Sequence, residues 1–189
     1  MKTFLIAATA LAAAAMAHAE SATYAADPTH TSINFEVKHF GTSTVRGRFD
    51  KKEGSVTIDR AAKTGKAEFT IDAASISTGV APLDTHLKSK DFFNAAEYPT
   101  AKFVGDKFSF DGNKVTSVTG TLTLAGKTHP ATLTASNFNC YENPMLKREV
   151  CGGDFETTIV RSQFGVSYGL AFGIPDSVRM LIQVEAIKQ

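Results

Sequence analysis

Short runs of alternating apolar and polar residues are the strongest structural signal in this sequence. In the first such run, Ile33, Phe35 and Val37 alternate with polar neighbours. This alternation is typical of a strand with one buried face, because successive side chains point to opposite sides of the strand. Gly, Asp, Asn and Pro separate the runs, as expected between strands. Further runs occupy residues 56–58, 69–71, 121–124 and 178–186. The pattern predicts an all-β fold.

Two turns indicate how neighbouring strands pair. Asp-Gly-Asn at 111–113 and Ala-Gly-Lys at 125–127 each separate two apolar runs, so we predict antiparallel hairpins there. About eight strands between Tyr24 and Lys188 fit either a closed barrel or a two-sheet sandwich. A closed barrel leaves no exposed strand edges, and about eight strands enclose room for one small ligand.

The N-terminus has the features of a secretory signal. A lysine precedes the apolar stretch 4–16, and the small residues Ala17 and Ala19 follow it. We expect cleavage before Glu20, with 1–19 as signal peptide and 20–189 as one domain. An uncleaved anchor is the alternative, but the stretch is shorter than the ~20 apolar residues that span a membrane.

The charge of the expected mature chain is balanced. Removing Lys2 from the 20 Lys and Arg residues leaves 19, against 19 Asp and Glu. Basic and acidic residues alternate along the chain and form no basic stripe, so we expect no nucleic-acid partner.

The two cysteines, Cys140 and Cys151, both follow the signal. An even number of cysteines in an exported protein predicts a disulfide and, with the signal, a periplasmic location. Metal ligation is the alternative, but no histidine lies within 139–154 and the spacing matches no zinc pattern. A redox role is less favoured, because catalytic pairs are typically Cys-x-x-Cys.

One segment departs from the alternation. Residues 82–91 begin with a proline suited to a first helical turn and continue with residues that tolerate a helix. Phe92, Phe93 and Tyr98 follow in what is not a strand. We interpret the stretch as a short helix and loop over one barrel mouth. An ordinary loop held to the core by its aromatic residues is the alternative.

Ordered motifs across the chain resemble the YceI family of lipocalin-like proteins. They cover essentially the whole expected mature domain. Leu83 departs from the family pattern where a basic residue is common, and Gln163 where an acidic residue is common. The matching motifs are Asp27-Pro28-x-His30-x-Ser32 with Phe35 and His39, Gly47-x-Phe49 with Gly54, Asp84-x-His86-Leu87-x-Ser89-x-Asp91-Phe92-Phe93, Tyr98-Pro99-x-x-x-Phe103, Gly120-x-Leu122-Thr123-Leu124-x-Gly126-x-Thr128-x-Pro130, Arg161-Ser162-x-Phe164-Gly165 and Asp176-x-Val178.

The resemblance implies an extended eight-stranded antiparallel lipocalin-like barrel whose short helix and loop cover one end. It also implies binding of a long isoprenoid lipid, an isoprenoid quinone or a polyprenyl phosphate, with no catalytic cofactor. Fourteen Phe and no Trp suit such a ligand, because Phe supplies apolar area without a polar ring atom. We expect the cavity to be lined by Phe35, Val37, Phe49, Val56, Ile58, Phe69, Ile71, Phe92, Phe93, Leu122 and Leu124.

A few polar residues at the mouth are expected to hold the head group. Arg161 suits a phosphate or a quinone carbonyl, but it also suits an ion pair with Asp84 or Asp91 that holds the cover closed. The candidates are His39, Asp84, His86, Ser89, Asp91 and Arg161.

The histidines do not predict a metal site. No pair has i, i+4 spacing and no Cys/His cluster is present among His30, His39, His86 and His129.

A binding protein is favoured over an enzyme. Ser162 with a remote histidine would satisfy a hydrolase by residue type alone, and no Gly-x-Ser-x-Gly motif occurs. A stress-protective or structural module for other amphiphiles is the alternative. Transient membrane contact is compatible with lipid carriage. The sequence is compatible with both a monomer and a homodimer.

Overall fold

The computed structural model describes residues 21–189, so the expected signal at 1–19 lies outside the described residues. The strands are β1 (Ala22–Ala26), β2 (Ser32–His39), β3 (Ser43–Phe49), β4 (Lys52–Asp59), β5 (Thr64–Asp72), β6 (Ile76–Ser77), β7 (Thr100–Asp111), β8 (Lys114–Leu124), β9 (Lys127–Asn143), β10 (Arg148–Val160) and β11 (Ser177–Lys188). The helices are α1 (Ala81–Lys88) and the 3-10 turns η1 (Ala73–Ser75), η2 (Arg161–Phe164) and η3 (Leu170–Phe172). Among the helices of this range, none has the length and hydropathy needed to cross a membrane.

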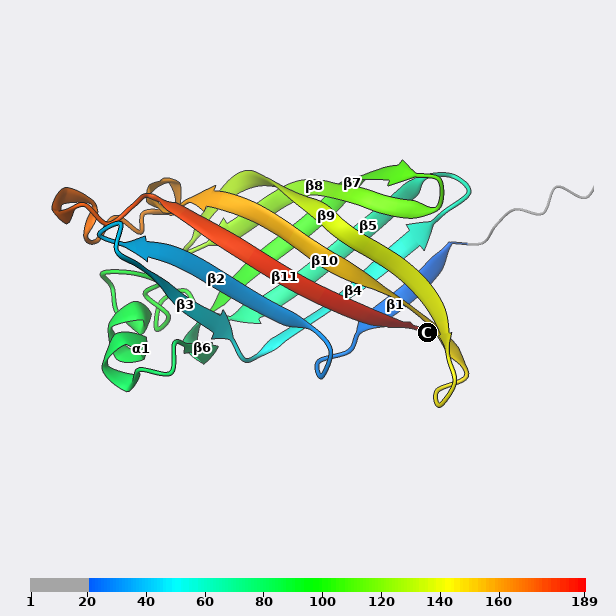
Figure 1. The fold of residues 1–189 in the computed structure, drawn as a ribbon, viewed down its shortest axis with the longest axis horizontal. Helices are drawn as coiled ribbons and strands as arrows, with labels where there is room; N and C mark the ends of the chain where they lie inside the picture. Colours follow the sequence, from blue (N-terminus) through cyan, green and yellow to red (C-terminus); the bar gives the residue numbers. More distant parts are fainter. Residues whose placement is uncertain (1–20) are drawn as a thin grey trace, which may run out of the picture.

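Eight strands form a closed antiparallel ring. Their order is β1, β4, β5, β7, β8, β9, β10 and β11, and β11 pairs back with β1. Figure 1 shows the resulting elongated barrel, with strands strongly inclined to its long axis. The predicted barrel is therefore confirmed and the sandwich alternative is wrong. Both predicted hairpins are present, as β7–β8 and β8–β9.

The seam of the barrel lies along β11. Residues 186–188 of β11 pair with β1, and residues 179–183 pair with β2. Two successive N-terminal strands therefore share one position in the wall, β1 near one end and β2 near the other. From β2 the sheet continues to β3 and then to β6, which ends the strand order.

The segment 78–99 joins β6 to β7 and carries α1 at one end of the barrel (Figure 1). The helix contacts β6, the last strand in the order. A covered strand edge is protected from pairing with other chains. Leu87 is buried, and Leu83 packs beside it against the core. The predicted short helix and loop over one end of the barrel are confirmed, and the helical part ends at Lys88. The backbone of Ser89 is extended, and its N–H bonds back to the His86 carbonyl.

Two family-motif glycines have a steric explanation. Gly47 lies directly opposite Phe35, and Gly54 lies directly opposite Phe69. A Cβ at Gly47 would come within 2.3 Å of the Phe35 ring, and one at Gly54 within 2.4 Å of the Phe69 ring. Each ring thus lies against bare backbone. Glycine at these positions leaves the space that the two large rings occupy beside the wall.

The predicted disulfide is confirmed. Cys140 on β9 and Cys151 on β10 are directly opposite in the strand register, with their Cα atoms 4.1 Å apart. Such a bond is typical of proteins that fold in an oxidising compartment.

Replacing both cysteines with alanine is expected to lower the free energy of unfolding by roughly 2–3 kcal/mol, because the unfolded chain regains the entropy of the open loop. Urea unfolding measures this. Wild-type protein in reducing buffer is the control and should show a similar loss. An unchanged midpoint in both samples would mean that strand pairing alone holds this hairpin.

Candidate ligand-binding cavity

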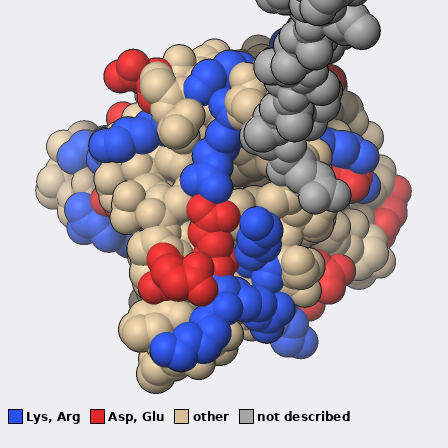
Figure 2. Space-filling view, turned by 90° about the vertical axis from the view of Figure 1, so that its right-hand side faces the viewer, with Lys and Arg blue, Asp and Glu red and all other residues tan. Residues whose placement is uncertain are grey.

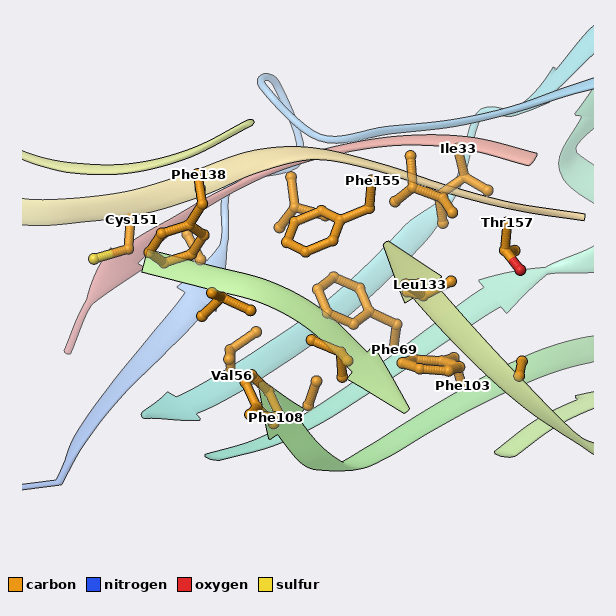
Figure 3. A pocket seen from close by; sticks show the side chains of 18 of the residues that line it. Ile33, Val56, Phe69, Phe103, Phe108, Leu133, Phe138, Cys151, Phe155 and Thr157 are labelled. Carbon is orange, nitrogen blue, oxygen red and sulfur yellow. The ribbon is translucent and has the colours of Figure 1, made fainter. Parts of the chain in front are cut away.

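The interior of the barrel contains two apolar cavities in series. The outer cavity, of about 360 Å³, lies beneath α1, and the inner cavity, of about 130 Å³, lies toward the other end. Apolar side chains dominate both linings. Figure 3 shows the inner cavity, into which the rings of Phe69, Phe103 and Phe155 project from different strands. An apolar cavity of ~150 Å³ holds a benzene-sized molecule, so the inner cavity has room for a short hydrocarbon segment.

Four side chains line both cavities: Ile33, Ile71, Leu122 and Met180. We call this set the neck. They come from β2, β5, β8 and β11, so the neck is formed by strands spread around the wall. A chain-like ligand that enters the outer cavity must pass these side chains to reach the inner one.

The far end of the inner cavity is bordered by a polar network. Tyr24 lines the cavity, and its hydroxyl donates to Glu149 at 2.7 Å. Arg60 donates to the other carboxylate oxygen of Glu149 at 2.6 Å. Burial and the bond to Glu149 raise the pKa of Tyr24 to about 12, so the hydroxyl keeps its proton and remains a donor. Figure 2 shows basic and acidic side chains intermixed over this end.

The outer cavity is covered by an aromatic cluster that we call the clasp. It consists of His86 on α1, Phe92 in the following turn and Tyr168 between β10 and β11. The His86 ring lies 4.9 Å from Phe92 and 4.7 Å from Tyr168, both edge-on, and Phe92 lies 5.2 Å from Tyr168. All three side chains line the cavity. The clasp therefore joins the α1 segment to the loop 165–176.

Arg161 holds that loop in place. It is only 5% exposed, and it donates to the carbonyls of Val166, Tyr168, Ile174 and Pro175 at 2.7–3.4 Å. These bonds use all but one of the guanidinium N–H groups. Burial lowers the pKa of Arg161, and the nearby charge of Asp176 opposes this shift. Arg161 also lines the outer cavity.

The expected ion pair of Arg161 with Asp84 or Asp91 is wrong. Asp84 instead accepts hydrogen bonds from the backbone N–H and the hydroxyl of Thr78, at 2.7 and 2.6 Å. The Thr78 hydroxyl bond holds the pKa of Asp84 below its usual range, although burial opposes this. Asp91 lies 3.0 Å from the His86 imidazole. Backbone carbonyls, not carboxylates, surround the guanidinium.

The head-group candidates therefore fall into two groups. His39, His86 and Arg161 line the outer cavity. Asp84, Ser89 and Asp91 instead shape the cover, and the Ser89 hydroxyl accepts a bond from the Asp91 N–H. His39 is exposed at the mouth, so it is not a buried histidine of the core. Contact with a head group stays a prediction for all of these residues.

Ser162 has a structural partner. Its hydroxyl donates to the Asp176 carboxylate at 2.6 Å, and its backbone N–H donates to the same carboxylate at 2.8 Å. Both bonds lower the pKa of Asp176. The Arg-Ser motif and Asp176 thus close the two ends of the loop 161–176, and the Ser162 hydroxyl is paired with a carboxylate rather than with a histidine.

Another motif forms the turn between β1 and β2. Asp27 accepts a hydrogen bond from the Thr29 hydroxyl at 2.6 Å and lies 2.8 Å from Nδ1 of His30. The bonds from His30 and Thr29 lower the pKa of Asp27 to about 2, and the bond to Asp27 raises the pKa of His30. The motif therefore organises the chain where β1 passes into β2.

All eleven predicted apolar lining residues border one or both cavities. The lining residues that sequence reasoning missed include Tyr168, Ile174 and Phe155. Phe155 lies in β10, whose alternation is interrupted by Gly152 and Gly153. Tyr168 and Ile174 lie in a loop without periodicity, so no local signal marked them. Leu83, which departs from the family pattern, lines the outer cavity.

Comparison with known proteins agrees with the architecture. A family model described as the YceI-like domain matches residues 24–186. The chain belongs to the YceI family. Among YceI relatives, a UPF0312 protein of Shewanella denitrificans is 35% identical over 161 residues, covering 85% of this chain and 83% of that protein. Protein YceI of Escherichia coli O157:H7 is 33% identical with the same coverage.

Solved structures share the YceI fold. The crystal structure of BcnA from Burkholderia cenocepacia has a TM-score of 0.71 at 28% identity and covers 85% of this chain and 99% of BcnA. A domain from Saccharophagus degradans, described as polyisoprenoid binding, has a TM-score of 0.63 at 17% identity and covers 88% of this chain and 98% of that domain. At that identity, the second match shows the fold alone.

Proposed function

We propose that this protein is a periplasmic carrier that holds the tail of a long isoprenoid lipid in its two cavities. The main supporting observation is the pair of apolar cavities in series, joined at the neck and bordered by polar groups at the two ends. A tail laid along the barrel would touch mostly hydrocarbon. The polar side chains of the outer cavity, His39, His86 and Arg161, lie at the end where a head group would remain.

The energetics suit transport across water. Each CH₂ group removed from water contributes roughly 0.8 kcal/mol, so a prenyl tail of many carbons does not cross an aqueous compartment unaided. Transfer between a bilayer and the barrel is different, because both surroundings are apolar. The free-energy difference between them is then small, and loading and release are both reversible.

The head group is held, on this proposal, chiefly by His39 and His86. Most of the donors of Arg161 are committed to carbonyls of the loop, which leaves little capacity for a phosphate. The two histidines line the cavity from the end of β2 and from α1. A quinone carbonyl accepts a hydrogen bond from a neutral imidazole, and a polyprenyl phosphate pairs with a protonated one.

Native mass spectrometry of the freshly purified mature chain, followed by organic extraction, tests the proposal. We expect a co-purifying isoprenoid, and its mass distinguishes a quinone from a polyprenyl phosphate. Delipidated protein should take up both classes when they are offered in detergent, with a preference that follows the head group.

Absence of any bound lipid, together with no uptake of either class, would reject isoprenoid carriage. Recovery of another amphiphile, such as a fatty acid, would point to the stress-protective or structural module instead. Release of a cleaved product during incubation would indicate a hydrolase.

A further inference from the structure

We propose that the cavity end of the barrel docks onto an anionic lipid bilayer through an apolar rim formed by Phe40, Val80, Tyr168 and Phe172. The inference rests on the proposed carriage of a membrane lipid and adds the surface through which that lipid passes. The four side chains are 54%, 53%, 44% and 70% exposed, respectively. They come from the β2–β3 turn, the start of α1 and the loop 165–176, which Figure 1 shows at the same end of the barrel.

The rim is continuous with the outer cavity. Tyr168 belongs to both, since it lines the cavity and is partly exposed. Phe40 follows the cavity residue His39, and their rings pack edge-on 4.7 Å apart. Phe40 also approaches Gly173, so the turn and the loop meet at the mouth. An apolar path therefore leads from the exposed surface into the barrel.

The backbone holds the rim residues in place. Phe40 adopts a left-handed conformation with φ 51°, which a bulky residue rarely adopts, and a bond from Thr42 N–H to the His39 carbonyl closes its turn. Phe172 lies in η3 between Gly169 and Gly173, both left-handed. The Phe172 N–H donates to the Gly169 carbonyl at 3.1 Å. The fold thus presents two aromatic rings to solvent on ordered turns.

Two lysines supply positive charge at this end. Lys38 is exposed, adjoins His39 and lines the outer cavity. Lys90 is exposed on the turn after α1, where the carboxylate of the neighbouring Asp91 is also exposed and lies 3.0 Å from the His86 imidazole. Lysines beside protruding aromatic residues are the composition of segments that lie in the membrane interface, where rings enter the acyl boundary and cations meet lipid phosphates. A bilayer seated on the rim would also meet the cavity mouth, through which an isoprenoid tail could leave the membrane directly.

Vesicle binding by the full mature chain tests the rim. The probe is vesicles of four parts phosphatidylcholine to one part phosphatidylglycerol, with co-sedimentation as the readout. The rim variant is Phe40→Asn with Phe172→Ser, since asparagine tolerates the left-handed backbone and neither ring lines a cavity. The matched control is Met145→Ser with Leu146→Ser, which removes two exposed apolar side chains from the turn between β9 and β10.

We expect the wild type and the control variant to bind the vesicles, and the rim variant to bind at least about tenfold more weakly, because two rings no longer leave water. The rim variant should still take up an isoprenoid quinone offered in detergent. That uptake separates failure of docking from failure of lipid carriage.

Three results would overturn the proposal: undetectable vesicle binding by the wild type, equal binding by the wild type and the rim variant, or an equal loss in both variants. If the wild type does not bind vesicles but forms a dimer that the rim variant cannot form, a second copy of the chain occupies the rim instead. Size-exclusion chromatography with light scattering measures that outcome.

Discussion

Arg161→Ala is expected to lower the free energy of unfolding by at least about 3 kcal/mol, because several backbone carbonyls lose a charged donor at once. The affected carbonyls belong to the loop that carries Tyr168. Without the guanidinium, Tyr168 loses its fixed position and the clasp over the outer cavity loosens. Urea unfolding measures the stability, and hydrogen exchange at residues 166–175 measures the loss of order.

Arg161→Lys is the matched control. An ammonium keeps the positive charge but has fewer donors and no planar fork, so we expect an intermediate loss. If the lysine variant matches the wild type, charge rather than the set of carbonyl bonds matters at this position. If the alanine variant unfolds like the wild type but no longer binds lipid, then Arg161 acts on the ligand and our structural assignment is wrong.

Leu122→Phe is expected to narrow the neck and weaken binding of long-tailed isoprenoid quinones more than tenfold. Excluding two CH₂ groups from the inner cavity forfeits about 1.6 kcal/mol, which corresponds to a little over tenfold in affinity. A quinone whose short tail ends in the outer cavity should bind as before. Titration of delipidated protein with quinones of increasing tail length measures both effects.

Thr121→Phe provides the control for the neck, because it adds a similar ring to the neighbouring, exposed position of β8. It should bind both tail lengths like the wild type. Extra volume in a packed interior costs about 1–3 kcal/mol of stability. The fold of each variant is therefore checked by circular dichroism. Equal affinity of Leu122→Phe for short and long tails, with wild-type strength, would show that the tail does not pass the neck.

Much of the fold was predictable because side chains along a strand alternate between its two faces, so every second residue points the same way. Phe35, Phe69 and Leu122 each lie on the apolar side of an alternating run, and each faces a cavity. The same argument worked for β11, where Val178 through Ala186 alternate along the seam. Turn residues between runs then identified the hairpins, since Gly and Asn adopt conformations that strands exclude.

The alternation of apolar and polar residues does not predict which residues form the mouth, because these residues lie mostly outside the strands. Arg161 bonds to carbonyls of residues 166–175, and backbone carbonyls are the same in every residue type. Tyr168 enters the clasp because the loop returns it to His86, which no local pattern encodes. The expected Arg161–Asp84 ion pair was wrong for a similar reason. Opposite charges in two family motifs suggested a contact, but the Asp84 carboxylate accepts hydrogen bonds from Thr78 instead.

The seam along β11 also determines when the barrel can form. The last strand, Ser177–Lys188, must pair with the first two strands of the described chain before the ring is complete. Contacts between the two ends of a chain close the longest possible loop, and topologies dominated by such contacts fold slowly. Until β11 is in place, the edges of β1, β2 and β10 that it pairs with therefore remain exposed. The folding chain is thus an open sheet, whose strand edges can pair with other chains, until its last described strand has docked.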